Sequence, residues 1–270
     1  MSKIAFTKMV GSGNDFVVVE GLPPVRASAL ADLSRQVCNR KFGVGADGLL
    51  VLEKSEIADV KMRILNADGS EAEMCGNGAR CVALYTSFKR KAQNVKLKIE
   101  TRAGIIDARV DQKTIRIKLT DPRDTGLDLP LKVYGRAMKV NFINTGVPHT
   151  VIFVEGLEKI AVENLGQDIR NHKAFAPKGT NVNFVEALKD DLIEVRTYER
   201  GVEGETLACG TGSVASALIF AIKAKRDKRV RVRTRSKELL SVYFKRKAGR
   251  FTDVWLEGRA RVVFNGEINV

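Results

Sequence analysis

Two cysteines lie in near-copies of one short sequence. Met74 to Ala83 reads M-C-G-N-G-A-R-C-V-A, and Leu207 to Ala217 reads L-A-C-G-T-G-S-V-A-S-A. In each copy the cysteine precedes glycines and an alanine-rich apolar segment with helical spacing. Cys75 and Cys209 are therefore expected at two helix entrances, where first-turn N–H groups and the helix dipole favour a thiolate over a thiol.

A thiolate and a thiol on opposite faces of one carbon can take a proton from one face and return it on the other. An α-proton is a very weak acid, so negative charge developing on the neighbouring carboxylate must also be stabilised. Helix-tip N–H groups can do this, and glycines let the backbone approach closely. The pattern predicts cofactor-free racemase chemistry, with a carboxylate held by the amides of Gly76, Asn77, Gly210 and Thr211.

Such a reaction needs two thiol pKa values that are held apart near the working pH. His149 and Glu199 are the candidates to tune them. A hydrogen-bonded structural role for His149 after Pro148 is an equal alternative.

Two other interpretations of the cysteines remain open. Cys75 alone would be read as an ordinary buried thiol, and its repetition at Cys209 argues against this. Cys75 and Cys209 could form a redox pair, although redox thiols commonly lie close together in sequence. Cys38 and Cys81 have no counterpart in the other half and are expected in the core.

The chain reads as an internal duplication. The two cysteines are 134 positions apart, and other landmarks recur in the same order at nearly the same interval. Three ordered matches are hard to obtain by chance. The landmarks preceding Cys75 and Cys209 are Gly13 to Glu20 with Gly146 to Glu155, and Gly43 to Asp47 with Lys178 to Asn181.

Apolar periodicity predicts an α+β fold of two pseudo-symmetric lobes. Each lobe is expected to be a curved, mainly antiparallel sheet wrapped around one central helix, the two helices running to about 89 and over 210–224. Residues 1–120, with about 259–270, would form the lobe carrying Cys75, and 121–258 the lobe carrying Cys209. The active site is expected in the cleft between them. A first helix is predicted from Ser28 to about Asn39, capped by Ser28, and Asp121 to Pro130 is predicted as a linker.

Composition excludes several classes. No apolar run approaches the roughly 18 residues of a membrane helix, and the start lacks a signal-like apolar core, so a cytoplasmic protein without membrane contact is expected. Four cysteines in 270 residues are too few for a disulfide scaffold. With no C-x-x-C pair and two histidines, a metal site is not expected.

The formal charge of +14 is concentrated in Lys223 to Arg250, which carries thirteen basic residues. Arg229 to Arg233 alternates arginine with valine as a strand does, and no aromatic residues are interleaved on the basic face. A solvated outer face is therefore favoured over nucleic-acid binding, so no nucleic-acid partner is expected.

Several blocks together resemble the diaminopimelate epimerase family over nearly the whole chain. Any one block alone would be a weak match, whereas the set is highly specific. The blocks are Gly11 to Phe16, Asn39 to Asp47, Asn66 to Glu71, Met74 to Arg80, Gly146 to His149, Asn181 to Phe184, Tyr198 to Gly201 and Ala208 to Gly212.

The resemblance implies an isomerase, an amino-acid epimerase that interconverts LL- and meso-2,6-diaminopimelate toward lysine and peptidoglycan. It also implies a cytoplasmic homodimer that uses neither pyridoxal phosphate nor metal. Cys75 and Cys209 would be the two bases, with Cys75 taking the proton from the LL isomer. The distal amino acid group of the substrate would be bound by Asn66, Asn181, Arg200 and Glu199, while Asn14, Gly76, Asn77, Gly210 and Thr211 would hold the reacting end.

The chain departs from the family pattern at two candidate substrate contacts. Many members have asparagine at the position of Val147, and some have glutamine at the position of Gly48. Proline racemases share the two-cysteine logic, but a proline substrate has no distal amino acid group for Arg200 to bind. Phenazine-pathway isomerases share the fold and lack the cysteine pair. A binding protein that uses the cleft without exchanging the α-proton is the alternative from another class.

Overall fold

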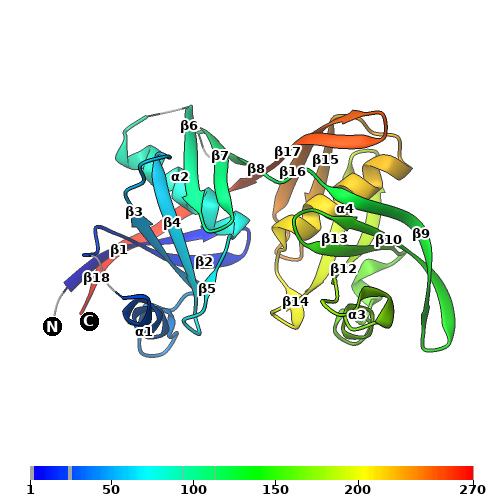
Figure 1. Ribbon diagram of the computed structural model, residues 1–270, viewed down its shortest axis with the longest axis horizontal. Helices are drawn as coiled ribbons and strands as arrows, with labels where there is room; N and C mark the ends of the chain where they lie inside the picture. Colours follow the sequence, from blue (N-terminus) through cyan, green and yellow to red (C-terminus); the bar gives the residue numbers. More distant parts are fainter. Residues whose placement is uncertain (1–2, 24–25, 93, 113, 270) are drawn as a thin grey trace. The chain divides into compact units, whose positions relative to one another are not determined.

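The computed structural model describes residues 3–23, 26–92, 94–112 and 114–269 (Figure 1). The chain divides into two compact units. Unit 1 comprises Met1–Ile117 with Gly258–Val270, and unit 2 comprises Lys118–Glu257.

Unit 1 is a mixed sheet with two helices. Its strands pair in the order β18-β1-β2-β3-β4-β6-β7-β8, and β5 pairs with β4. The β2–β3 and β4–β6 pairs are parallel and the others are antiparallel. The elements are β1 (Lys3–Gly11), β2 (Asn14–Glu20), α1 (Ala27–Cys38), β3 (Gly48–Glu53), β4 (Val60–Asn66), β5 (Glu71–Ala72), α2 (Gly76–Lys89), β6 (Val95–Thr101), β7 (Gly104–Asp111), β8 (Thr114–Lys118) and β18 (Arg261–Asn269).

Unit 2 repeats this plan. Its strands pair in the order β9-β10-β11-β12-β13-β15-β16-β17, with β14 on β13, and the β11–β12 and β13–β15 pairs are parallel. The elements are β9 (Arg123–Val133), β10 (Arg136–Asn144), β11 (Pro148–Phe153), η1 (Leu157–Lys159), α3 (Val162–Arg170), η2 (Lys173–Phe175), β12 (Asn181–Lys189), β13 (Leu192–Glu199), β14 (Gly204–Thr206), α4 (Gly210–Lys223), β15 (Arg229–Arg233), β16 (Leu239–Lys247) and β17 (Arg250–Arg259).

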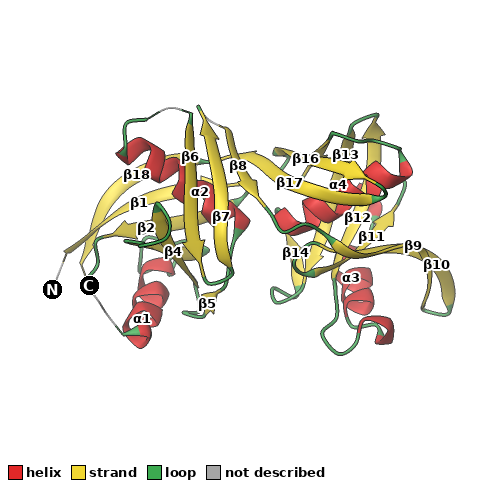
Figure 2. Ribbon diagram, turned by 45° about the horizontal axis from the view of Figure 1, so that its top comes forward, coloured by secondary structure: helices red, strands yellow, loops and turns green. Residues whose placement is uncertain are grey.

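The helices α2 and α4 are the buried centres of their units. Ten of the fourteen residues of α2 are buried, and in α4 every residue from Gly212 to Ala221 is buried. A helix that is apolar on all sides has to be surrounded by other elements, and Figure 2 shows strands on several sides of each. The predicted α+β fold, with a mainly antiparallel sheet around a central helix, is confirmed.

Two local predictions are wrong. Residues 121–130 are not a linker, because β9 begins at Arg123 and pairs with β10 along its length. The alternation there is obscured by two register shifts and by positive φ angles at Asp124 and Asp128. Ser28 does not cap the first helix: α1 begins at Ala27, and Arg26 at the N-cap position makes no side-chain capping bond.

The packing of α3 on β13 depends on one glycine. A Cβ atom added at Gly166 would lie 2.5 Å from the Cβ of Tyr198, which is buried in β13. We therefore expect Gly166→Ala to lower the free energy of unfolding by about 1–3 kcal/mol, because the helix has to move away from the sheet. Urea denaturation measures this change. Asn164→Ala, on the exposed side of α3, is the control, and an equal loss in both variants would contradict the packing argument.

Candidate functional site

Cys75 occupies the N-cap of α2. Its backbone is extended, with φ −139° and ψ 120°, and its carbonyl accepts the first helical bond from the N–H of Ala79 at 2.8 Å. The Gly78 N–H points at the Cys75 Sγ atom, 3.5 Å away. The sulfur thus accepts a hydrogen bond from the first turn, an arrangement that favours a thiolate.

A tight hairpin brings Asn14 to the first turn of α2. Ser12 and Gly13, both with positive φ, form the two-residue turn between β1 and β2. The Asn14 side-chain carbonyl accepts a hydrogen bond from Asn77 at 2.6 Å. The buried Arg80 donates to Asn77 at 2.7 Å and to Ser12 at 2.6 Å, so the hairpin and the helix are held together.

A charged cluster beside Asn14 was missed in the sequence. Asp15 pairs with Lys8 at 2.7 Å and with Arg40 at 2.8 Å, and Arg40 also binds Asp47 at 2.7 Å. Burial disfavours the ionised carboxylate of Asp15, but hydrogen bonds from Arg40 and Lys8 outweigh it and lower its pKa to about 2. The cluster ties the 39–47 loop to the Asn14 hairpin, and a spacing of 25 residues between Asp15 and Arg40 gave no local signal for it.

Cys209 occupies the matching N-cap of α4. Its carbonyl accepts from the Ser213 N–H at 2.9 Å, and its Sγ lies 3.5 Å from the Thr211 hydroxyl. The residue is 6% exposed, and no side-chain capping bond to its sulfur is formed. Both cysteines therefore lie at helix entrances, as the repeated motif predicted.

Glu199 at the end of β13 is hydrogen-bonded to Cys209. Its carboxylate also accepts from the Thr206 hydroxyl at 3.0 Å. Burial raises the pKa of Glu199, and burial together with the negative charge of Glu199 raises the pKa of Cys209. This environment keeps Cys209 as a thiol that donates to Glu199.

His149 is fully buried on β11. Its Nδ1 lies 3.1 Å from the side-chain nitrogen of Asn183, whose oxygen accepts from Thr197 at 3.0 Å. Burial, and then the charge of Arg200, lower the pKa of His149 to about 3, so the ring is neutral. The Asn183 bond makes Nδ1 the acceptor, and the protonated Nε2 has no hydrogen-bond partner among the residues that the structure describes. The role of His149 in tuning the cysteines stays a prediction.

Asn181 and Arg200 lie together. The Asn181 side-chain oxygen accepts from the Arg200 backbone N–H at 2.8 Å, and its nitrogen donates to the Pro148 carbonyl at 3.0 Å. The Arg200 guanidinium makes a long 3.4 Å contact with the Lys178 carbonyl. In unit 1 Asn66 ends β4, as Glu199 ends β13, and its side chain donates to Ser70 at 2.9 Å.

The four helix-tip residues open the first turns of the two helices, Gly76 and Asn77 in α2 and Gly210 and Thr211 in α4. Their N–H groups belong to the set that has no acceptor within a helix. Cys38 and Cys81 are 2% and 0% exposed, so their prediction as core residues is confirmed.

The two departures have different structural settings. A Cβ atom added at Gly48 would lie 2.9 Å from the Leu65 carbonyl on the adjacent strand, so a larger residue there requires a shifted backbone. The Val147 carbonyl accepts from the Thr145 N–H within the turn before β11. Glycine at position 48 is thus tied to the close β3–β4 pairing.

Two negative findings apply to the described part of the chain. Across 3–23, 26–92, 94–112 and 114–269, His, Cys, Asp and Glu side chains form no group of three or more placed to hold a metal ion. None of the helices in the same ranges is both long and apolar enough to cross a membrane.

The basic segment is partly neutralised within unit 2. Arg229 and Arg231 pair with Asp191 at 3.2 and 2.6 Å, and Lys223 pairs with Asp128 at 2.8 Å. Alternate residues of β15 are buried valines, as the sequence pattern predicted.

Comparison with known proteins agrees with the motif set. The sequence model of one family, described as Diaminopimelate epimerase, matches residues 6–123 and 141–253. The chain belongs to the diaminopimelate epimerase family. The chain is similar to the diaminopimelate epimerases of Aquifex aeolicus, with 43% identity over 98% of this chain and 97% of that protein, and of Methanocella arvoryzae, with 41% identity over 100% and 98%.

Solved structures show the same fold at low identity. A Bacillus anthracis phenazine biosynthesis protein of the PhzF family superposes with a TM-score of 0.79 at 17% identity and covers 100% of both chains. A probable proline racemase from Agrobacterium radiobacter superposes with a TM-score of 0.74 at 17% identity, covering 99% of this chain and 93% of its own. These two likenesses show the fold alone, and the sequence relationship assigns this chain to the diaminopimelate epimerase family.

The Glu199–Cys209 contact predicts that loss of the Glu199 charge lowers the pKa of Cys209. Glu199→Gln removes the negative charge that helps to raise the Cys209 pKa, so the thiol should ionise at lower pH. The pH dependence of Cys209 alkylation, measured on the isolated peptide by mass spectrometry, should shift its midpoint down. An unchanged midpoint would show that burial alone sets the Cys209 pKa. Glu155→Gln, which alters an exposed carboxylate after β11, is the control.

Proposed function

We propose that this chain is an isomerase that interconverts LL- and meso-2,6-diaminopimelate by moving a proton at the α-carbon between Cys75 and Cys209. Family membership over nearly the whole chain supports the substrate. The observation that carries the mechanism is the matched placement of two cysteines as N-caps of two equivalent, buried helices. The chemistry that this supports requires neither pyridoxal phosphate nor a metal.

The two thiols differ in a way that suits one base and one acid. The Cys75 sulfur accepts an N–H bond from Gly78, whereas the Cys209 thiol donates to Glu199. In the resting enzyme Cys75 is then the thiolate and Cys209 the thiol. Removal of the proton from the LL isomer by Cys75, and delivery of a proton by Cys209, inverts the carbon, and the reverse reaction exchanges the roles.

The helix tips supply the stabilisation that thiols alone cannot. As the α-proton leaves, negative charge spreads onto the α-carboxylate. The first-turn N–H groups of Gly76, Asn77, Gly210 and Thr211 are the donors proposed for it, and Asn14 is added through its bond to Asn77. Donors that are already oriented need little reorganisation during the reaction.

The distal amino acid group of the substrate is assigned to Asn66, Asn181, Glu199 and Arg200. Arg200 suits the carboxylate, because a planar guanidinium binds it in a bidentate way. The Asn181 side chain accepts a hydrogen bond from the Arg200 backbone N–H and donates one to the Pro148 carbonyl. These two bonds support a role for Asn181 in positioning Arg200.

A cytoplasmic homodimer is also proposed, as the family resemblance implies. Two large apolar side chains on β18, Val263 and Phe264, are 45% and 46% exposed, which favours a covered face in an assembly.

The central test is proton NMR of LL-diaminopimelate in D₂O with reduced protein and no added cofactor or metal. The α-proton signal should disappear while the meso isomer forms. Cys75→Ala and Cys209→Ala should each lower turnover at least about 10³-fold, because each removes one of the two proton-transfer groups.

Cys38→Ala is the matched control, since that thiol is buried in the core, and it should keep turnover. Full turnover by either Cys75→Ala or Cys209→Ala would sink the two-base mechanism. Exchange of the α-proton of proline, and not of diaminopimelate, would assign a different substrate to this chain.

A second test compares equivalent glycines in the two helices. A Cβ atom at Gly212 would overlap the Asn183 side-chain oxygen and lie 3.3 Å from the Cys209 sulfur. At Gly78 the closest atom is a movable methyl group of Leu50, at 3.1 Å. Gly212→Ala should therefore lower kcat at least about tenfold more than Gly78→Ala, because displaced catalytic atoms reduce rates steeply. Equal effects would contradict this assignment of the Cys209 environment.

A further inference from the structure

A bidentate arginine–glutamate pair recurs at equivalent places in the two units. In unit 1 Arg63 on β4 binds Glu71 on β5, with nitrogen–oxygen distances of 2.8 and 2.9 Å. In unit 2 Arg196 on β13 binds Glu205 on β14, with both distances 2.7 Å. Each pair joins the strand before the site to the short strand that leads to a cysteine.

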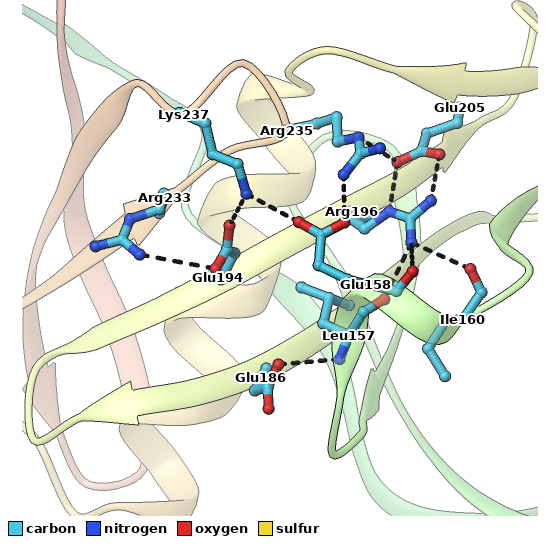
Figure 3. Close-up of polar contacts among 10 residues, drawn as sticks. All are labelled: Leu157, Glu158, Ile160, Glu186, Glu194, Arg196, Glu205, Arg233, Arg235 and Lys237. Atoms are coloured by element: carbon cyan, nitrogen blue, oxygen red, sulfur yellow. Dashed lines mark hydrogen bonds and ion pairs between the residues drawn. The ribbon is translucent and has the colours of Figure 1, made fainter.

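A second arginine reaches the same glutamate in each unit. Arg102 lies 3.7 Å from Glu71, and Arg235 lies 3.7 Å from Glu205. We refer to Arg63, Glu71 and Arg102 as the first cluster, and to Arg196, Glu205 and Arg235 as the second cluster. Figure 3 shows the second cluster, in which Arg196 binds Glu205 with two nitrogens and Arg235 contacts both Glu205 and, at 2.5 Å, Glu158.

The residue after each second arginine holds the chain near the cysteine by its backbone. The Ala103 N–H donates to the Glu73 carbonyl at 3.2 Å, and the Ser236 N–H donates to the Leu207 carbonyl at 3.0 Å. Both glutamates precede their cysteine by four residues. The approach to each N-cap is therefore fixed at two points, one by the side-chain cluster and one by a main-chain bond.

The clusters are partly shielded from water. The Arg196 and Glu205 side chains are 10% and 16% exposed, and those of Arg63 and Glu71 are both 18% exposed. Arg196 also donates to the carbonyls of Leu157 at 3.0 Å and Ile160 at 3.1 Å (Figure 3). Shielded guanidinium–carboxylate forks fix geometry better than single, solvated ion pairs do.

In unit 2 the second cluster is linked to the Cys209 thiol through Thr206 and Glu199. Thr206 follows Glu205 on β14, and its hydroxyl donates to Glu199, which accepts from Cys209. A shift of β14 would therefore alter the Glu199–Cys209 contact as well as the N-cap itself.

We propose that the two clusters are positioning devices, one for each thiol, in which Glu71 and Glu205 hold the segments that aim Cys75 and Cys209. The inference rests on the proposed function for its catalytic readout. Its structural part, one cluster for one cysteine, stands on the repeated contacts alone.

The test uses the more exposed arginine of each cluster, because the buried members risk misfolding. Arg102→Gln and Arg235→Gln should each lower kcat about tenfold or more while KM stays within about twofold, since misplacement by an ångström can cost 10²-fold. The thermal unfolding midpoint should move by no more than about 3 °C, because partly exposed ion pairs contribute little stability. Arg102→Lys and Arg235→Lys keep the charge and should recover much of kcat.

Two matched controls alter arginine ion pairs outside the clusters. Arg90→Gln breaks the pair with Asp59 in unit 1, and Arg229→Gln breaks the pair with Asp191 in unit 2. Both should keep kcat within about twofold of the unaltered protein, since these partly exposed pairs do not contact the segments that lead to the cysteines. A loss of kcat in the controls equal to that in the cluster variants would overturn the proposal.

A second measurement does not require catalysis. It distinguishes a shift of one cysteine from a loss of rigidity throughout the protein. Alkylation by iodoacetamide, followed for each cysteine peptide, should change at least about threefold at Cys75 in Arg102→Gln and at Cys209 in Arg235→Gln, because only the adjacent N-cap segment is released. An equal change at both cysteines, or at neither, would overturn the one-cluster, one-thiol assignment. If the unaltered protein fails to exchange the substrate α-proton, the proposed function fails, while the alkylation pattern still decides on the clusters.

Discussion

The unpaired N–H groups at the starts of α2 and α4 are the constraint on which the site depends. A helix start leaves backbone donors without helical acceptors, and a buried helix cannot leave them to bulk water. In unit 1 the Cys75 sulfur accepts one of these donors, the N–H of Gly78. The other first-turn donors belong to Gly76 and Asn77 in α2 and to Gly210 and Thr211 in α4.

Packing in the core of each unit fixes the position of its helix start. Because α2 and α4 are buried on nearly all sides, neither can tilt without disturbing the strands around it. The polar contacts at the helix starts then refine the geometry. Burial, and then the negative charge of Glu199, raise the pKa of Cys209, and Asn14 is fixed against Asn77 by the hairpin turn. The two helix starts are alike in their backbone, and the side chains beside the two sulfurs differ.

The sequence predicted α1 and the central helices α2 and α4 because their apolar periodicity is strong, and it predicted the cysteine positions because the motif occurs twice. The helix α3 was not predicted. It failed at β9, where positive φ residues and register shifts hide the strand. It gave no sign of the Asp15–Arg40 contact, which joins residues 25 positions apart. It also gave no sign of the arginine–glutamate clusters, because their side chains meet across strand pairs at spacings that have no characteristic pattern. The burial of His149, and its bond to Asn183, likewise follow only from the parallel pairing of β11 with β12.

The pairing of β18 with β1 has a consequence for the order of folding. Unit 2 is formed by one continuous stretch of chain, and its first strand, β9, pairs with the next strand, β10. The equivalent place in unit 1 is taken by β18, whose Asn269 lies opposite Lys3. Pairing of strands so far apart in sequence is slow, because a long loop has to close first. We therefore expect unit 2 to complete its sheet before unit 1 does.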